Sequence, residues 1–225
     1  MRNHAVIARS DTIGFGEIPV VEMVKTVLAW VAFGAFHSLT VSEGYERLAR
    51  RAMGQAAFAA YHRLLFTAYS AVATGVAVLY IHSLPDTPLY RIPGWSRWLF
   101  HGVQALGAAL LLWTPWDLKE FVGLRQWERH RRDPQPEVGR NGRLFTGAGY
   151  SLVRHPLYLG CSLILAFRPT QTRNAFASTV AVVAYFYIGT FFEERRMERK
   201  FGEAYREYRR RVPRFFPLPR GRGTP

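Results

Sequence analysis

The sequence of 225 residues has little cysteine, few acidic residues and none of the common motifs for phosphate or metal binding. Its one cysteine, Cys161, excludes a framework of internal disulfides and any CxxC motif. Seven histidines are scattered without an HExxH motif or a pair four residues apart, so we predict no metal site. Neither GxxxxGK[ST] nor GxGxxG is present, which argues against a Walker-type ATP site and a Rossmann-type domain. Acidic residues precede the first apolar run, and we expect no cleaved signal peptide.

What the chain does have is basic charge and long uncharged runs. It carries 30 Lys and Arg against 16 Asp and Glu. Four runs of 17, 22, 19 and 19 residues contain no charge: Thr26–Ser42, Leu64–Pro85, Trp98–Trp116 and Asn174–Phe192. A membrane-spanning helix needs about 18 to 20 apolar residues, which three of the runs reach. A fifth run, Leu157–Phe167, reaches about that length if it extends back to Tyr150. The sequence therefore predicts an all-α polytopic membrane protein with about five transmembrane helices and a cytoplasmic C-terminal amphipathic helix.

Most of the basic residues fall in alternate connections between these helices. Residues 43–63, 117–156 and 193–225 hold 23 of the 30. Cytoplasmic segments of membrane proteins are enriched in Lys and Arg, so we predict an outside N-terminus and a cytoplasmic C-terminus, in a bacterial inner membrane. Basic stretches such as RQWERHRR (125–132) also occur in nucleic-acid-binding proteins, but their position beside membrane helices favours anionic lipids as the partner and no nucleic acid.

The chain divides at one long polar connection, 129–149, which is rich in Pro, Gly and charge. We predict an N-terminal transmembrane region of three helices with a cytoplasmic loop (1–143), a C-terminal catalytic region (144–217) and a basic tail (218–225). Pairs of small residues such as Ala71/Gly75 suit helix packing within one chain or between chains, and they leave the oligomeric state open.

The stretch SLVRHPLYLG (151–160) places Arg and His directly before an apolar run. Proline suits the first turn of a helix and disfavours helix in the residue before it, so a helix is expected to begin at Pro156. A helix start favours an anion, and the Arg154 guanidinium matches a carboxylate or phosphate. The alternative is an interfacial anchor, with Arg154 reaching the headgroups, Tyr158 in the aromatic belt and Gly160 packing helices.

A second stretch, 191–217, continues from the last apolar run. Met197, Phe201, Tyr205 and Tyr208 recur at helical spacing, which predicts one face of a helix that continues out of the membrane until Pro213 stops it. Glu193 and Glu194 are adjacent carboxylates in an otherwise basic tail. A basic amphipathic helix lying on the inner leaflet is the competing interpretation.

A helical hairpin that turns near RPTQTRN (168–174) brings Arg154 and His155 to the same side of the membrane as Glu193 and Glu194. A zwitterionic ligand suits such a site: the Arg154 side takes its carboxylate, and the glutamates and tyrosines take its cationic and aromatic parts. S-adenosylmethionine offers all of these groups, and aromatic faces and carboxylates favour its sulfonium.

These residues also carry a family resemblance. RHPLYLG (154–160), EE (193–194) and FGEAYREYRRRVP (201–213) resemble the signature of integral-membrane methyltransferases related to isoprenylcysteine carboxyl methyltransferase and the phospholipid methyltransferases. The segments HS (37–38), YHRLLF (61–66) and FVGLRQ (121–126) resemble, more loosely, bacterial methanethiol S-methyltransferase-like or NnrU-like members.

The resemblance implies that the C-terminal half holds S-adenosylmethionine. By position it implies a set of cofactor-site residues: His155, Pro156, Tyr158, Gly160, Glu194, Tyr205 and Tyr208. Arg154 and Glu193 are the pair we expect to matter for activity. The implied reaction is an in-line methyl transfer, which depends mainly on positioning and desolvation of the acceptor.

The acceptor stays open at this point, between a small or lipophilic thiol, an isoprenylcysteine-type carboxylate and the amine of phosphatidylethanolamine. A different class also remains, namely a non-catalytic NnrU-like or lipid-binding membrane protein. That class predicts no cofactor binding.

Overall fold

The computed structural model describes residues 18–132 and 144–217. Over these residues the chain is mostly helical: α1 (Ile18–Thr40), α2 (Glu43–Met53), α3 (Gln55–Ser83), α4 (Arg97–Trp113), α5 (Leu118–Val122), α6 (Leu124–Arg132), α7 (Gly149–Leu152), α8 (Pro156–Ala166), α9 (Arg173–Phe201) and α10 (Glu203–Arg211). Two short strands, β1 (Pro88–Arg91) and β2 (Thr170–Thr172), and a 3₁₀ turn (Gly94–Ser96) complete the list.

Three of the helices, α1, α3 and α9, are long and apolar enough to cross a membrane. Many of their large apolar side chains point outward, as membrane-spanning helices require where they face lipid; Val72 and Leu79 on α3 are 67% and 72% exposed. These helices support an integral membrane protein. Helix α4 has 17 residues and α8 has 11, so the predicted count of five spanning helices stays a prediction.

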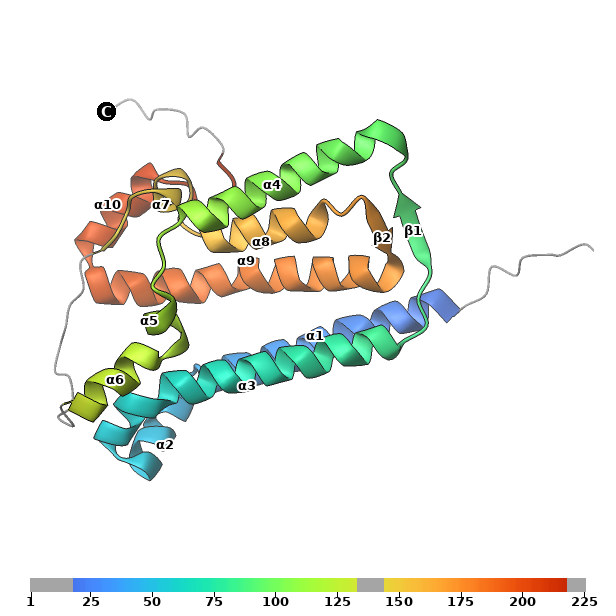
Figure 1. The fold of residues 1–225 in the computed structure, drawn as a ribbon. Coiled ribbons are helices and arrows are strands. Elements are labelled where there is room, and N and C mark those ends of the chain that lie inside the picture. Colours follow the sequence, from blue (N-terminus) through green and yellow to red (C-terminus); the bar gives the residue numbers. More distant parts are fainter. Residues whose placement is uncertain (1–17, 133–143, 218–225) are drawn as a thin grey trace, which may run out of the picture.

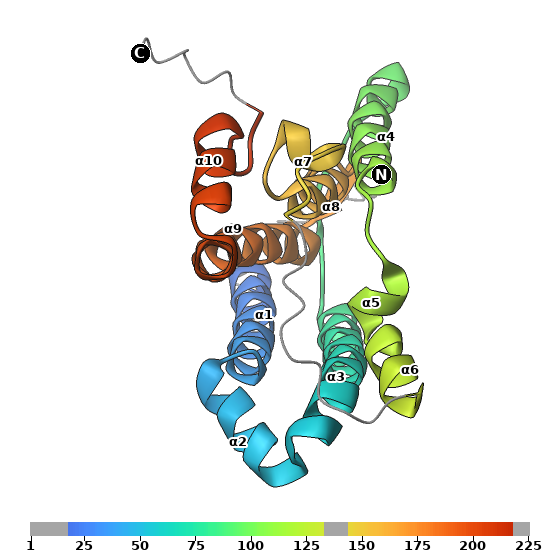
Figure 2. The same cartoon turned by 90° about the vertical axis from the view of Figure 1, so that its left-hand side faces the viewer.

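The helices form two layers with α9 between them (Figure 1). Helices α1 and α3 lie together on one side of α9, and α4 and α8 lie on the other (Figure 2). Helix α1 packs on α9 and α3, while α4 packs mainly on α8. The C-terminal region, α8 to α10, thus contacts both halves of the bundle.

A small antiparallel sheet at one end departs from the all-α prediction. Strand β1 pairs with β2, with Tyr90 opposite Gln171. The predicted turn near 168–174 therefore contains a strand rather than a simple helical hairpin loop. Asn174 reinforces the link, because its Nδ2 donates to the Pro85 carbonyl (3.0 Å) and its backbone N–H donates to Asp86 (3.1 Å). The connection between α3 and α4 is tied to the connection between α8 and α9.

Glycine allows α4 and α8 to touch closely. A Cβ on Gly107 would lie 2.7 Å from the Gly160 carbonyl oxygen, and a Cβ on Gly160 would lie 2.7 Å from Leu111 Cδ2. Real Cβ atoms do not approach other atoms so closely, so both positions need a residue without a side chain. Small residues at a close crossing are typical of helix packing in membranes.

The predicted single helix through 191–213 is wrong, because the chain breaks at Gly202. That residue has φ +54°, which side-chain-bearing residues rarely adopt, and it separates α9 from α10. Helix α10 then ends at Arg211, just before Pro213, as predicted. Because of the break, Tyr205 and Tyr208 lie on a different helix from Met197 and Phe201.

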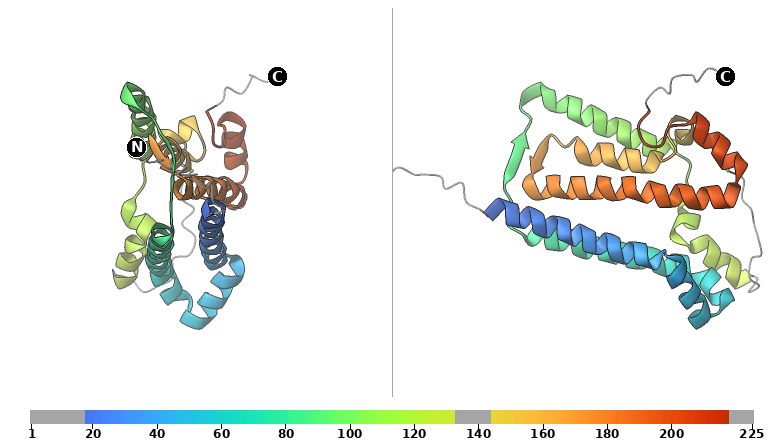
Figure 3. Two further views of the ribbon diagram at one scale, coloured as in Figure 1. Left: turned by 90° about the vertical axis from the view of Figure 1, so that its right-hand side faces the viewer. Right: turned by 180° about the vertical axis from the view of Figure 1, so that it is seen from behind.

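The basic elements gather at one end of the molecule. Helices α2, α6 and α10 lie at the end opposite β1 and β2 (Figures 1 and 3). An ion pair between Arg199 and Glu43 (3.1 Å) joins α9 to α2 there. The arrangement agrees with the grouping of basic segments used to predict the topology, and which end faces the cytoplasm stays a prediction.

Candidate functional site

The site is built around the start of α8, which begins at Pro156 as predicted. His155 precedes it with φ −125° and ψ 63°, outside the helical region. The chain beyond α10 returns to this point: the backbone N–H of Arg154 donates to the Pro213 carbonyl (2.9 Å), and that of His155 donates to the Arg214 carbonyl (3.2 Å). Residues 213–214 of the C-terminal stretch thus pair with residues 154–155, which directly precede α8.

A buried ion pair fixes this contact. The Arg154 guanidinium, on a residue that is 5% exposed, donates from Nε and Nη2 to Glu194 Oε1 at 2.8 and 2.6 Å. Its Nη1 donates to the carbonyls of Arg209 and Val212. Arg214 donates to both Glu194 oxygens at 3.1 Å. The two arginines satisfy a carboxylate that is 3% exposed, and they connect α8, α9 and the residues after α10.

The neighbouring carboxylate, Glu193, is in a different situation. Its side chain is 42% exposed, and Oε2 lies 3.4 Å from His155 Nδ1. Rings of His155, Tyr158 and Phe186 stack in a row, with interplanar angles of 2° and 8°. Glu193 is therefore partly exposed and lies beside a titratable histidine, whereas Glu194 is enclosed by two arginines.

These contacts shift the pKa values of groups around the site. Burial alone would lower the pKa of His155, but hydrogen bonds and the negative charges of Glu193 and Glu194 outweigh it and raise that pKa. Burial, with Glu194 nearby, raises the pKa of Tyr205 to about 12. Burial and Glu193 likewise raise the pKa of Tyr150. The phenols therefore stay neutral at physiological pH.

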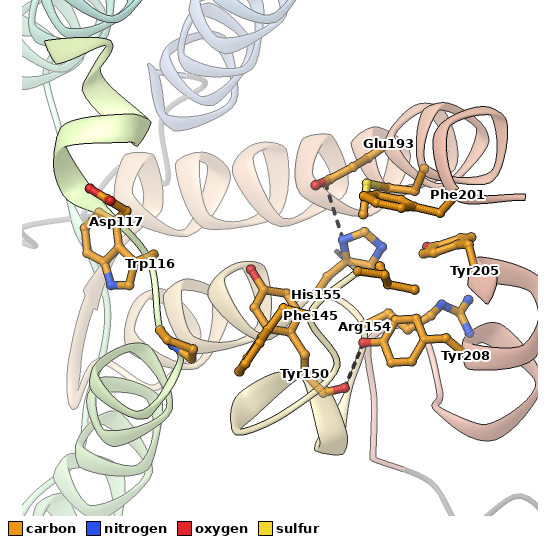
Figure 4. A pocket seen from close by; sticks show the side chains of 13 residues that line it. Trp116, Asp117, Phe145, Tyr150, Arg154, His155, Glu193, Phe201, Tyr205 and Tyr208 are labelled. Atoms are coloured by element: carbon orange, nitrogen blue, oxygen red, sulfur yellow. Dashed lines mark hydrogen bonds and ion pairs between the residues drawn. The ribbon is translucent and has the colours of Figure 1, made fainter. Parts of the chain in front are cut away.

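A cavity of about 680 Å³ opens beside these residues (Figure 4). Its walls come from the segment after α4, the segment before α7, the start of α8, the end of α9 and α10. The lining residues are Pro115, Trp116, Asp117, Leu144, Phe145, Tyr150, Arg154, His155, Glu193, Met197, Phe201, Tyr205 and Tyr208. The volume lies in the range of pockets that hold drug-sized ligands.

Comparison with known proteins gives relatives of one kind. The chain is 35% identical over 133 residues to methanethiol S-methyltransferase 2 of Bradyrhizobium diazoefficiens, covering 58% of this chain and 50% of the relative. It is 32% identical over 117 residues to methanethiol S-methyltransferase of Mycobacterium tuberculosis, covering 51% and 46%. The chain is related in sequence to the methanethiol S-methyltransferases. The resemblance to that group, expected from the sequence motifs, is confirmed.

The sequence match covers only part of each protein. The chain spans about half the length of the methanethiol S-methyltransferases it matches. No family model matches the chain, and no solved structure matches it.

Five of the nine predicted site residues line the cavity: Arg154, His155, Glu193, Tyr205 and Tyr208. The other four support it from outside. Glu194 is enclosed by Arg154 and Arg214, and Tyr158 lies behind His155. Gly160 lies in the contact with α4, and Pro156 packs close to Gly149. The predicted residues thus contribute both a cavity wall and its scaffold.

Sequence reasoning missed the wall formed by Pro115, Trp116, Asp117, Leu144 and Phe145. These residues belong to connections between helices and carry no periodic pattern. Only the fold brings them opposite α9 and α10. Among the described residues, no group of three His, Cys, Asp or Glu side chains is arranged to hold a metal ion.

Proposed function

We propose that the chain is an S-adenosylmethionine-dependent methyltransferase of the membrane that methylates a small or lipophilic thiol. The observation that carries this proposal is the cavity, which is lined by the Glu193 carboxylate and several aromatic rings together with Arg154 and His155. The relatives, all named for methanethiol S-methylation, support the thiol as acceptor.

The residues present fit the methyl donor. Aromatic faces and a carboxylate favour a cation, and Phe201, Tyr205 and Glu193 supply both. The same rings suit a purine by stacking. When bound, S-adenosylmethionine would supply a methyl group attached to a positively charged sulfur, which is the leaving group of the transfer.

Arg154 takes a different role from the one that the sequence motif implied. Four hydrogen bonds already occupy its guanidinium, to Glu194 and to two backbone carbonyls. We assign it to holding α8, α9 and the residues after α10 in place, so it acts as a positioning residue. Glu194 shares that role, because its two oxygens are occupied by Arg154 and Arg214.

We assign Glu193 as the group that takes a proton from the acceptor. In the overall transfer, the thiol sulfur forms a new bond to carbon and its S–H bond breaks, so a proton must leave. Asp117 also lines the cavity, but it caps the start of α5 and pairs with Arg125. Glu193, which lies beside His155, is therefore the carboxylate we assign to receive the proton.

The test is S-adenosylmethionine binding by calorimetry and methyl transfer to methanethiol, detected as dimethyl sulfide, with purified protein in detergent. We expect Glu193→Gln to lower turnover about 100-fold or more, because general base groups contribute roughly that much. Glu207→Gln is the matched control, since Glu207 pairs with Arg210 on the surface of α10 and does not line the cavity.

Other outcomes separate the alternatives. Methylation of phosphatidylethanolamine or of an isoprenylcysteine carboxylate in place of methanethiol would replace the thiol as acceptor and keep the cofactor. If well-folded protein binds no S-adenosylmethionine, the enzyme proposal fails and the non-catalytic class takes its place.

A further inference from the structure

The cavity has two walls of different chemistry. One wall, from α9 and α10, carries the Glu193 carboxylate and the phenols of Tyr205 and Tyr208. The opposite wall carries apolar side chains from two connections between helices, chiefly Trp116 and Phe145 (Figure 4). We call Trp116, Phe145 and Leu144, which all line the cavity, the apolar wall.

The apolar wall is anchored at one close contact. A Cβ on Gly149 would lie 2.1 Å from Thr114 Oγ1, so the start of α7 touches the end of α4 directly. Thr114 is 1% exposed, and its hydroxyl donates to the Leu110 carbonyl at 2.7 Å. The contact fixes the segment that contains Trp116 beside the segment that contains Phe145.

Each ring of the wall has its own support. The Phe145 ring packs over Gly147, where a Cβ would lie 3.1 Å from Phe145 Cζ. The same ring meets the Tyr150 ring edge-on, with 6.2 Å between the ring centroids. The Trp116 ring meets the Phe121 ring edge-on, with 5.7 Å between the ring centroids. Trp116 and Phe145 nevertheless remain 49% and 55% exposed, so a large apolar area is free to contact a ligand.

We propose that the apolar wall binds the alkyl group of the acceptor thiol and sets its size. This inference rests on the proposed function. A cationic methyl donor gains from the Glu193 side and its phenols, which leaves the uncharged wall for the uncharged acceptor. Asp117, at the edge of the wall, is engaged by Arg125 and by the α5 backbone. Trp116 and Phe145 are therefore specificity-determining residues, which favour an apolar thiol and limit its length.

The experiment compares acceptors of different size and polarity with the full chain in detergent. For Trp116→Ala and Phe145→Ala, kcat/KM is measured with methanethiol, 1-butanethiol and 2-mercaptoethanol, together with the Kd of S-adenosylmethionine. Trp113→Ala is the matched control, because Trp113 is 55% exposed on α4 and is not among the cavity residues.

We expect the ratio of kcat/KM for butanethiol to that for methanethiol to rise about tenfold in Trp116→Ala or Phe145→Ala, because truncation makes room for a longer chain. The Kd of S-adenosylmethionine stays unchanged, and Trp113→Ala behaves as the unaltered chain. The inference is overturned if the acceptor ratio is constant while the Kd rises, since the wall would then hold the methyl donor. If the unaltered chain binds S-adenosylmethionine and methylates no thiol, the acceptor assignment fails together with this inference; if it binds no S-adenosylmethionine, the proposed function itself fails.

Discussion

At the scale of single residues, two adjacent glutamates at the end of α9 have opposite environments. Glu194 is 3% exposed and held by Arg154 and Arg214, whereas the Glu193 side chain is 42% exposed and lines the cavity. Removing one partner of a buried ion pair is more costly than losing a surface pair, because a charge is left without compensation. One glutamate therefore serves the structure and the other is available for chemistry.

His155, which lies beside both glutamates, makes the stability of the folded protein depend on pH. Its pKa is raised in the folded protein by Glu193 and Glu194 despite burial, so the folded state binds its proton more tightly than the unfolded chain does. Its contribution to stability is full below the unfolded pKa of about 6.5 and is lost as the pH rises through the raised folded pKa. We expect the melting-temperature difference between the unaltered chain and His155→Gln to be largest in mildly acidic buffer and to shrink as the pH increases.

Thermal unfolding in detergent between pH 5 and 9 measures this difference. Glu193→Gln removes one cause of the raised pKa, so the pH dependence is expected to be weaker in that background. A stabilisation by His155 that grows with pH would contradict the assignment.

Sequence alone predicts residues whose role is local. Pro156 indicated the start of α8, and the helical spacing of the tyrosines placed them on one face. The hairpin prediction brought Arg154 near Glu194, but it did not foresee Arg214, which lies 20 residues after Glu194 and comes near it only because the chain folds back. Trp116 and Phe145 had no local signal at all.

At the scale of elements, the contact of α4 with α8 sets the position of the site. Arg154 and His155 directly precede α8, and Gly107 and Gly160 let α4 and α8 meet without a gap. Gly160 belongs to the motif, but it lies in the helix contact and is absent from the cavity residues. Its role as the structure shows it is packing.

We expect Gly160→Ala to destabilise the protein by about 1–3 kcal/mol, because the added methyl group would overlap Leu111 and the Gly107 carbonyl. Gly75→Ala is the matched control. A Cβ on Gly75 of α3 has no atom within 4 Å, so the change is expected to be neutral or slightly stabilising. Thermal unfolding of both variants in detergent checks the prediction, and equal melting temperatures would contradict it.

Elements with strong periodicity or long apolar runs were predictable, and breaks between them were not. The runs used to predict the helices fall in α1, α3, α4 and α9. The break at Gly202 was missed because the apolar spacing continues across it, and the spacing gives no information on φ. The β1–β2 pairing depends on two connections 80 residues apart meeting in the fold, which a local pattern cannot show.

At the scale of the whole molecule, the distribution of charge predicts an orientation. Helices α2, α6 and α10 lie at one end and the β1–β2 sheet at the other (Figure 3). If the basic end is cytoplasmic, the cavity opens near the cytoplasmic surface of the membrane, where a soluble methyl donor is available.

Cysteine labelling tests the orientation. In a Cys161→Ser background, Thr87→Cys near β1 and Ala52→Cys in α2 place one thiol at each end, both at exposed positions. We expect a membrane-impermeant maleimide to label Thr87→Cys in spheroplasts and to label Ala52→Cys only after the membrane is opened. The reverse pattern would show that the orientation is inverted.

The return of residues 209–214 to the start of α8 also determines when the site forms during synthesis. Arg154 and His155 receive their backbone partners, the carbonyls of residues 209–214, from a segment that leaves the ribosome after the apolar helices that the structure describes. A nascent chain that has inserted its helices still lacks these partners and the α10 wall of the cavity. Insertion into the bilayer and assembly of the cavity are thus separate events, and the second follows only after residues 203–214 have been synthesised.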